Sequence, residues 1–175
     1  MKKIVSLAVL LTGLLISTTN AKAQEDKSKR PSPSAIITQV INSGAEISIN
    51  YSQPSVKGRT IGKDLEPKDG QVWRTGANEA TVFETSKALK INGKELPAGK
   101  YALFTISGKD SWTVIFNKTW NQWGAYDYKQ ADDILRTTAQ PKKATAFAEK
   151  MTFTVDKSGL VTLLWGDNSV SFTVD

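Results

Sequence analysis

Apolar residues recur at every second position through much of this chain, and this spacing restricts the folds open to it. Ile47, Ile49 and Tyr51 alternate with polar residues, and the same alternation returns at residues 151–155 and 170–174. A period of two places one face of a β-strand against a core and the other face in water. We therefore predict an all-β protein built from amphipathic strands.

Turn-forming residues separate these runs at short intervals, as antiparallel connections require. Asn92-Gly93 is the strongest hairpin signal, because both residues tolerate a positive φ. Residues 97–99, 107–110, 156–159 and 166–169 supply further turns. The runs amount to about ten strands. They predict a single-domain antiparallel β-sandwich or flattened barrel, since short amphipathic strands must cover one another's apolar faces.

The N-terminus has the three parts of a secretory signal peptide. Met1-Lys2-Lys3 is positively charged, residues 4–16 are mostly apolar, and Ala21-Lys22-Ala23 has the small-x-small pattern of a cleavage site. The apolar run is shorter than the roughly 20 residues that span a bilayer. We predict a signal peptide at residues 1–23, export to the periplasm or cell surface, and no integral membrane span after cleavage.

Two further segments stand apart from the strand pattern. Residues 24–34 are polar or charged and contain two prolines, which predicts a flexible lead-in before an all-β domain at residues 35–175. Residues 142–150 are rich in alanine and are the one helical competitor, with a length that allows about two peripheral turns.

The chain has no His and no Cys among its 175 residues, and this excludes many catalytic and metal-binding classes. A Ser-His-Asp triad, a Cys-His nucleophile, an imidazole or thiolate zinc site and any disulfide are ruled out. Removal of the signal peptide takes away three lysines and lowers the net charge from +6 to +3. Basic residues are scattered among acids, so we expect no nucleic-acid partner. We also expect no cofactor and no bound metal.

Residues 72–81, VWRTGANEAT, form the first candidate site, with Trp73, Arg74, Asn78 and Glu79 around a glycine. A ligand site needs such groups, namely an aromatic face for stacking and directed hydrogen-bond partners. The alternative is structural: Trp73 belongs to the core, and Arg74 pairs with Glu79 or caps buried backbone.

Residues 117–128, NKTWNQWGAYDY, form the second candidate site, with Asn117, Trp120, Trp123 and Tyr126. Aromatic residues interleaved with amides and a carboxylate are typical of carbohydrate sites, because a sugar offers both CH faces and hydroxyl groups. The same composition also suits a long loop that folds back and plugs one end of a sandwich. Long loops in compact domains are often functional, so both interpretations stand.

Carboxylates offer the one catalytic alternative. Glu79 and Asp127 could act as an acid and base pair in glycoside hydrolysis, and Asp132 and Asp133 are the other acids in this region. Oxygen ligands of this kind also bind Ca²⁺, although no EF-hand spacing is present. The alternative is a solvated turn.

Four segments resemble the secreted bacterial family known as domain of unknown function 2911. They are residues 51–59, VWRTGANEAT at residues 72–81, LPAGKYALF at residues 96–104, and residues 112–118 together with Trp123-Gly124-Ala125-Tyr126 and Arg136. The resemblance covers the chain from about Ser32 to the C-terminus. It implies export and a common β-rich fold, and it supplies no catalytic residues.

From the residues themselves we expect an exported, non-enzymatic module that binds a glycan or another cell-envelope ligand. The alternatives are a carboxylate-dependent glycoside hydrolase and a structural or partner-binding envelope protein without a small-ligand site. The expected ligand-binding residues are Trp73, Arg74, Asn78, Glu79, Asn117, Trp120, Trp123 and Tyr126.

Overall fold

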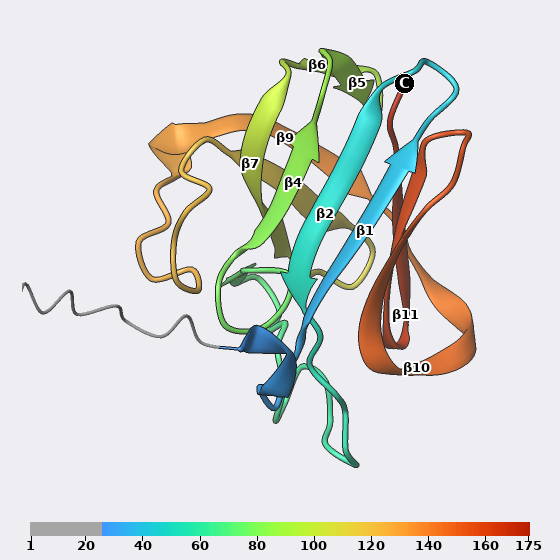
Figure 1. Cartoon of the computed structure of the whole chain (residues 1–175). Helices are drawn as coiled ribbons and strands as arrows, with labels where there is room; N and C mark the ends of the chain where they lie inside the picture. The colour runs from blue at the N-terminus through green and yellow to red at the C-terminus, as the bar shows by residue number, and fades with distance from the viewer. Residues whose placement is uncertain (1–25) are drawn as a thin grey trace, which may run out of the picture.

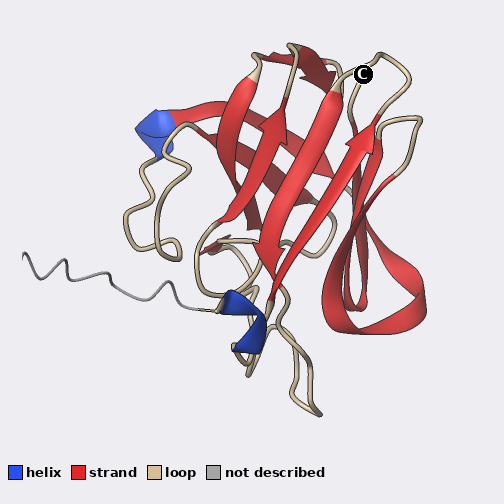
Figure 2. Ribbon diagram, in the orientation of Figure 1, coloured by secondary structure: helices blue, strands red, loops and turns tan. Residues whose placement is uncertain are grey.

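The computed structural model describes residues 26–175, so the predicted signal peptide lies outside the described residues. Strands dominate this part of the chain, and its helical elements are two short 3₁₀ turns, η1 (Lys27–Lys29) and η2 (Gln130–Asp132) (Figure 2). Within residues 26–175 no helix has the length and apolar character needed to cross a membrane. The all-β prediction is confirmed.

Seven antiparallel strands form the larger sheet, in the order β1-β2-β4-β7-β8-β9 with β3 paired to β7 (Figure 1). They are β1 (Ser34–Val40), β2 (Glu46–Ser52), β3 (Val72–Trp73), β4 (Thr81–Thr85), β7 (Gly99–Ile106), β8 (Trp112–Asn117) and β9 (Asp133–Ala139). Because β8 occupies one edge of β7, both β3 and β4 pair with the other edge. Residues 74–80 therefore leave the sheet as a loop between two strands that lie end to end; we call this the β3–β4 loop.

The second layer is built from the C-terminal strands and a short hairpin. Its elements are β10 (Pro141–Val155), β11 (Leu160–Thr173), β5 (Leu89–Ile91) and β6 (Lys94–Leu96). The β5–β6 hairpin turns at Asn92 and Gly93, whose φ values are 47° and 79°, as the sequence predicts. It joins the layer through a bridge between Ile91 and Val174.

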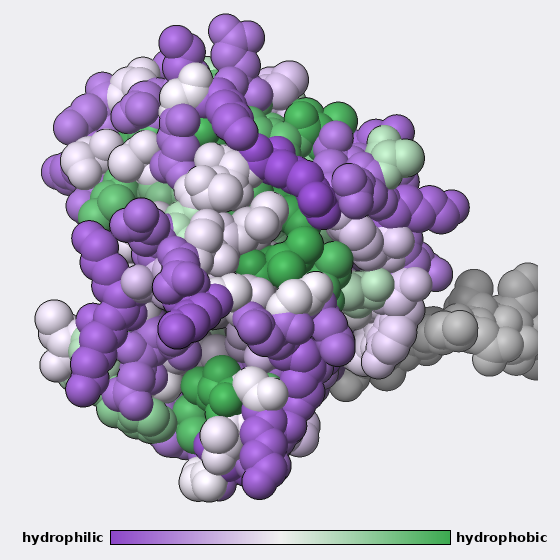
Figure 3. Space-filling model, turned by 180° about the vertical axis from the view of Figure 1, so that it is seen from behind, coloured by the Kyte–Doolittle hydropathy of each residue, from purple (hydrophilic) through white to green (hydrophobic). Residues whose placement is uncertain are grey.

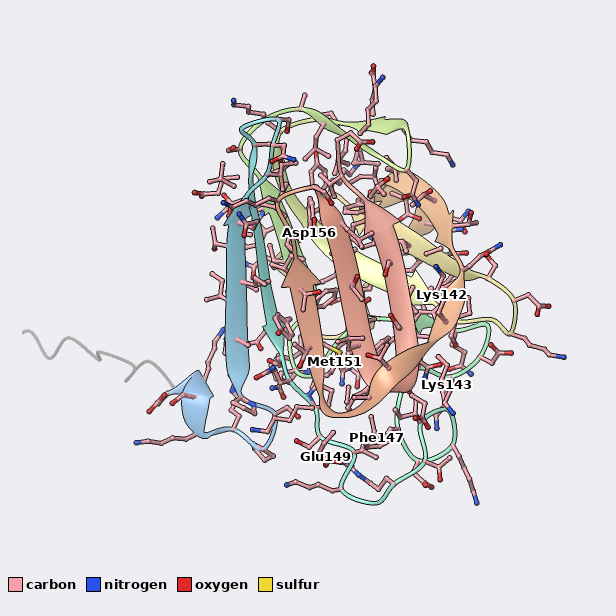
Figure 4. All side chains as sticks on the ribbon, turned by 90° about the vertical axis from the view of Figure 1, so that its right-hand side faces the viewer. Lys142, Lys143, Phe147, Glu149, Met151 and Asp156 are labelled. Atoms are coloured by element: carbon pink, nitrogen blue, oxygen red, sulfur yellow. The ribbon has the colours of Figure 1, made fainter. Side chains whose placement is uncertain are left out.

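The strand β11 reverses direction near Gly166, so its two halves run side by side. The Thr162 and Ser171 hydroxyl oxygens are 2.8 Å apart, and the Val174 amide donates to the Gly159 carbonyl at 2.9 Å. The strand β10 curls around this pair: its beginning pairs with residues 168–170 and its end with residues 161–164. Figure 4 shows the curl, with Lys142 and Lys143 on one side, Phe147 at the bottom and Met151 on the other side.

Residues 142–150 correct one sequence prediction, because they belong to β10 and form no helix. Pairing with neighbouring backbone outweighs the helix propensity of this short segment. Lys143 is in register with Asn168, and the Val56 amide donates to the Glu149 carbonyl at 2.9 Å. A segment of this length gains little from helix formation in water.

The core lies between the two layers. Phe116 of β8 makes edge-to-face contacts with Phe83 of β4 and Phe172 of β11, at centroid distances of 5.0 and 5.8 Å. Trp165 and Met151 are also buried there. Seen from behind, the surface is mainly hydrophilic, and hydrophobic residues form separate patches (Figure 3).

A second, smaller cluster lies on the opposite side of the large sheet, which we call its outer face. Ala102, Phe104 and Ile115 are buried there under Ala125 and Tyr128. Residues 118–129, which we call the aromatic loop, therefore cover part of the outer face, whereas the sequence analysis considered a plug at one end of the sandwich. The Phe104 and Tyr128 rings are 5.1 Å apart.

Candidate functional site

The two segments that the sequence singles out lie side by side. The Ala80 amide donates to the Gln122 carbonyl at 3.0 Å, and the Gly124 amide donates to the Asn78 carbonyl at 3.1 Å. These bonds form an antiparallel bridge between Glu79 and Trp123. The β3–β4 loop and the aromatic loop thus present one continuous surface.

The β3–β4 loop has an unusual and well-supported backbone. Thr75 and Asn78 have φ values of 49° and 60°, and a β-branched residue rarely adopts the left-handed region. Thr75 is fully buried, and its carbonyl accepts a 2.8 Å hydrogen bond from the Thr81 hydroxyl. A Cβ on Gly76 would lie 3.1 Å from the Ser52 carbonyl oxygen. Strain of this kind persists only where the surroundings over-determine the conformation.

Residues 26–33, which we call the lead-in segment, contact this loop. Arg30 Nη1 lies 3.0 and 2.8 Å from the two Glu79 carboxylate oxygens, and Lys27 Nζ lies 2.9 Å from Glu79 Oε1. The Arg30 guanidinium carbon is 5.8 Å from the centroid of the Trp123 ring. The Asn78 side-chain amide donates to the Ser32 carbonyl at 3.0 Å. The stretch that the sequence predicts to be flexible is anchored here by charged and polar contacts.

These contacts determine the charge state of Glu79. Burial raises its pKa, but hydrogen bonds from Lys27, from its own backbone and from Arg30, together with the charge of Lys27, outweigh burial and hold the pKa below its usual range. The carboxylate therefore stays ionised at neutral pH and is poorly suited to act as a general acid. Asp127 is exposed and forms no hydrogen bond or ion pair with any other described residue. Nothing in this arrangement favours the hydrolase alternative.

A groove of about 150 Å³ lies beside Glu79 on the outer face of the large sheet. Asn50 and Val82, which are in register on β2 and β4, line it from below. Trp120 and Gln122 line it from the aromatic loop, and Trp120 is 41% exposed. The Gln122 side-chain oxygen has no hydrogen-bond donor within the described residues. We call this the outer-face groove; its remaining lining residues include Lys27, Ser34, Glu79 and Asn121.

The other predicted site residues divide into exposed and buried groups. Trp123 and Tyr126 are 53% and 80% exposed on the aromatic loop. Trp73 is buried, and its indole nitrogen donates to the Gly76 carbonyl at 3.0 Å. Asn117 is fully buried, and its amide donates to the Lys129 carbonyl at 3.1 Å. Trp73 and Asn117 therefore support the loops from below, and we leave them out of the proposed ligand set.

The two adjacent acids after the aromatic loop have structural contacts. Asp133 accepts hydrogen bonds from the Tyr128 hydroxyl and from Arg136 Nε, each at 2.7 Å, and from the Asn117 amide at 2.8 Å. Asp132 forms a 3.1 Å ion pair with Lys118. Among residues 26–175, no group of three or more acidic side chains is placed to hold a metal ion.

Several site residues were missed by the sequence analysis. Lys27 and Arg30 gave no local signal, because their partner Glu79 is about fifty residues away in the chain. Asn50 could have been predicted as a site residue, since the alternation that buries Ile49 and Tyr51 places it on the outer face. Gln122 lay inside a segment of interest but was not chosen.

The fold and the site together define a small β-sandwich protein with an aromatic loop fixed on the outer face of one sheet. The chain belongs to the family described as Protein of unknown function (DUF2911), whose model matches residues 32–174. The match confirms the resemblance found in the sequence and includes both the β3–β4 loop and the aromatic loop. No curated protein and no solved structure matches the chain.

Proposed function

We propose that the protein is an exported, non-enzymatic module that binds a glycan or another cell-envelope ligand in the outer-face groove. The observation that carries this proposal is the position of Trp120, a partly exposed indole in the wall of a groove that is also lined by the amides of Asn50 and Asn121 and by the apolar Val82. An exposed aromatic face beside amide and carboxylate groups suits a sugar, which has apolar CH faces and hydroxyl groups.

The surroundings of Trp120 support a preformed site. Lys100 Nζ lies 5.5 Å from the centroid of the Trp120 ring and also pairs with Glu84 at 3.2 Å. The backbone of the neighbouring Gln122 is fixed by the hydrogen bond from Ala80. Side chains that are already ordered lose less conformational entropy when a ligand binds.

The volume of the groove and the ionisation state of Glu79 limit the ligands that the groove can bind. A volume of about 150 Å³ is below the usual range of roughly 300–1,000 Å³ for small-molecule pockets. The groove therefore fits one unit of a longer chain, with neighbouring units passing over Trp123 and Tyr126. Glu79, which Lys27 and Arg30 hold ionised, gives the groove a charged wall. The predicted signal peptide at residues 1–23 supports a location in the periplasm or at the cell surface.

Replacing Trp120 with alanine tests this function. We expect the affinity for a bound oligosaccharide to fall by at least about tenfold, taking the contact of a sugar face with the indole to be comparable to base–aromatic stacking, which contributes on the order of 1–3 kcal/mol. Affinity is measured by isothermal titration calorimetry against neutral oligosaccharides and soluble peptidoglycan fragments. The matched control is Phe147→Ala, which removes another exposed aromatic side chain from the β10 curl.

Two results would contradict the proposal. The first is that none of the oligosaccharides or peptidoglycan fragments binds to the folded protein. The second is that Trp120→Ala and Phe147→Ala bind with the affinity of the unchanged protein. Either result would leave a structural or partner-binding envelope protein as the better interpretation.

A further inference from the structure

Within residues 26–175, Arg74 is the arginine whose side chain has no hydrogen-bond or ion-pair partner. Arg30 pairs with Glu79, Arg136 pairs with Asp133, and Arg59 donates to two backbone carbonyls. Arg74 forms no side-chain hydrogen bond or ion pair with the described residues, and its Nε is buried. A buried donor without an acceptor is unusual in a native protein and calls for an explanation.

The same arginine lines a small cavity that shares no lining residue with the outer-face groove. The cavity has a volume of about 160 Å³. Arg59 and Arg74 line it together with the indoles of Trp73 and Trp165. Both indole nitrogens already donate to backbone carbonyls, of Gly76 and Glu66, so the tryptophans supply apolar walls.

Arg59 contributes a fixed guanidinium with donors to spare. Its Nε donates to the Val56 carbonyl at 3.1 Å, and its Nη2 donates to the Ser55 carbonyl at 2.7 Å. A guanidinium carries five N–H donors, so most of the hydrogen-bonding capacity of Arg59 and all of that of Arg74 is unused.

One carboxylate also lines the cavity and must be counted. Glu66 accepts a 2.8 Å hydrogen bond from the Lys68 amide and forms no ion pair with either arginine. Glu79, on the same β3–β4 loop as Arg74, is committed to Lys27 and Arg30. The cavity therefore keeps a net positive charge.

We propose that Arg59 and Arg74 form a binding pocket for an oxyanion, namely the carboxylate or sulfate group of an acidic sugar or a free inorganic anion of the same chemistry. The planar guanidinium fork matches carboxylate, sulfate and phosphate oxygens, and the resulting hydrogen bonds are assisted by charge. The terminal N–H groups of Arg74, which have no partner among the described residues and are not buried as Nε is, are the donors that an acidic group in the cavity can reach.

The backbone of the β3–β4 loop positions Arg74 for this role. Arg74 lies between the strand β3 and the buried, left-handed Thr75, and its carbonyl accepts a 3.2 Å hydrogen bond from the Thr81 amide. On the side of the aromatic loop, a Cβ on Gly124 would lie 3.2 Å from Arg74 Nη1, so the guanidinium is packed closely there. Preorganised donors lose little entropy when an anion binds.

Thermal denaturation and calorimetry of the purified protein test the pocket. The probes are sodium sulfate, sodium phosphate, glucuronate and galacturonate, each compared with sodium chloride at equal ionic strength. We expect saturable binding and stabilisation by the oxyanions beyond that given by chloride. Equal binding of sulfate and uronate would identify free anion chemistry, and a clear preference for uronates would identify acidic sugars.

Variants connect this binding to the two arginines. Arg74→Met keeps an apolar stem similar to that of arginine and removes the guanidinium, and we expect it to weaken oxyanion affinity by at least about tenfold. Arg74→Lys keeps the charge without the fork and is expected to recover part of the affinity. Lys142→Met is the matched control, because it removes one positive charge from a separate cavity of about 550 Å³. Arg59→Met serves as a second variant if Arg74→Met does not fold.

The proposal is wrong if oxyanions stabilise the protein no more than chloride does, or if the folded Arg74→Met and Arg59→Met variants bind them as tightly as Lys142→Met does. It stands independently of the outer-face groove. Trp120→Ala is expected to leave oxyanion binding unchanged. Arg74 does not line the outer-face groove and is therefore not part of the proposed glycan site, so Arg74→Met is expected to leave binding of neutral oligosaccharides unchanged. Failure at one site therefore does not imply failure at the other.

Discussion

Replacing Gly159 with alanine is expected to lower the free energy of unfolding by about 3 kcal/mol. Gly159 has a φ of 88°, and a Cβ at this position would lie 1.8 Å from the Val174 carbonyl oxygen. The obstacle is backbone, so it cannot rotate away as a side chain could. The chain must separate there, which disrupts the 2.9 Å hydrogen bond from the Val174 amide to the Gly159 carbonyl. In a domain of this size we expect the midpoint of thermal unfolding to fall by roughly 6–12 °C.

Gly93→Ala is the matched control for this prediction. Gly93 has a similar φ of 79°, but a Cβ there would meet no atom within 4 Å. Gly93→Ala is therefore expected to lower the free energy of unfolding by about 1 kcal/mol, which is the cost of holding an alanine at positive φ. Chemical denaturation of both variants compares the two effects, and an equal loss of stability would mean that Gly159 and Val174 are not in close contact.

Local patterns predicted the strands and turns well because each of these depends on neighbouring residues. The alternation around Ile47, Ile49 and Tyr51 buries these side chains, as expected for one face of a strand. The dipeptide Asn92-Gly93 forms a tight hairpin because both residues adopt the positive φ that such a turn needs.

Features that depend on pairing between distant parts of the chain could not be predicted from local sequence patterns. The alanine-rich segment 142–150 has helix propensity, but its pairing with β11 and with residues 55–57 makes it part of a strand. Composition also marked residues 24–34 as flexible, because the segment is polar and charged, contains two prolines and has no apolar residue to bury. The carboxylate partner of Arg30, Glu79, is brought to it only by the fold.

In the candidate site, too, features that depend on local sequence were predicted, and features that depend on long-range contacts were not. The composition of the two loops marked the segments that meet, and among their residues Glu79 and Trp120 line the outer-face groove. Arg74 was predicted to be a ligand contact, the partner of Glu79 or a cap for buried backbone, and the ion pair of Glu79 with Arg30 removes the second of these roles. Which polar residues of a loop face outward depends on the support beneath it, and that support includes the buried Asn117.

Replacing Asp133 with alanine is expected to cost about 2–3 kcal/mol, below the roughly 3–5 kcal/mol typical of a broken buried pair, because Arg136 remains partly exposed. The side chain of Asp133 is 6% exposed and accepts hydrogen bonds from Asn117, Tyr128 and Arg136. Its loss leaves donors at both ends of the aromatic loop without their acceptor. We therefore expect weaker glycan binding at Trp120 as well, although Asp133 does not line the groove.

Tyr128 provides a readout that reports on this network directly. Burial and the hydrogen bond to Asp133 raise the pKa of Tyr128 to about 12, although Arg136 opposes the shift. The neutral phenol is thus favoured in the folded state, so its contribution to stability is complete below pH about 10 and is lost as the pH rises through about 12. In Asp133→Ala we expect the tyrosinate absorbance of Tyr128 to appear at a lower pH, because burial remains while the acceptor is gone.

The adjacent acid supplies the control for Asp133→Ala. Asp132 is less buried than Asp133, with its side chain 24% exposed, and it pairs with Lys118 and accepts a hydrogen bond from the Thr119 hydroxyl. Asp132→Ala removes the same charge one residue away, and we expect little change in unfolding, in the titration of Tyr128 or in glycan binding. If the two variants behaved alike in denaturation and titration, the buried contacts of Asp133 would not be what holds the aromatic loop against the sheet.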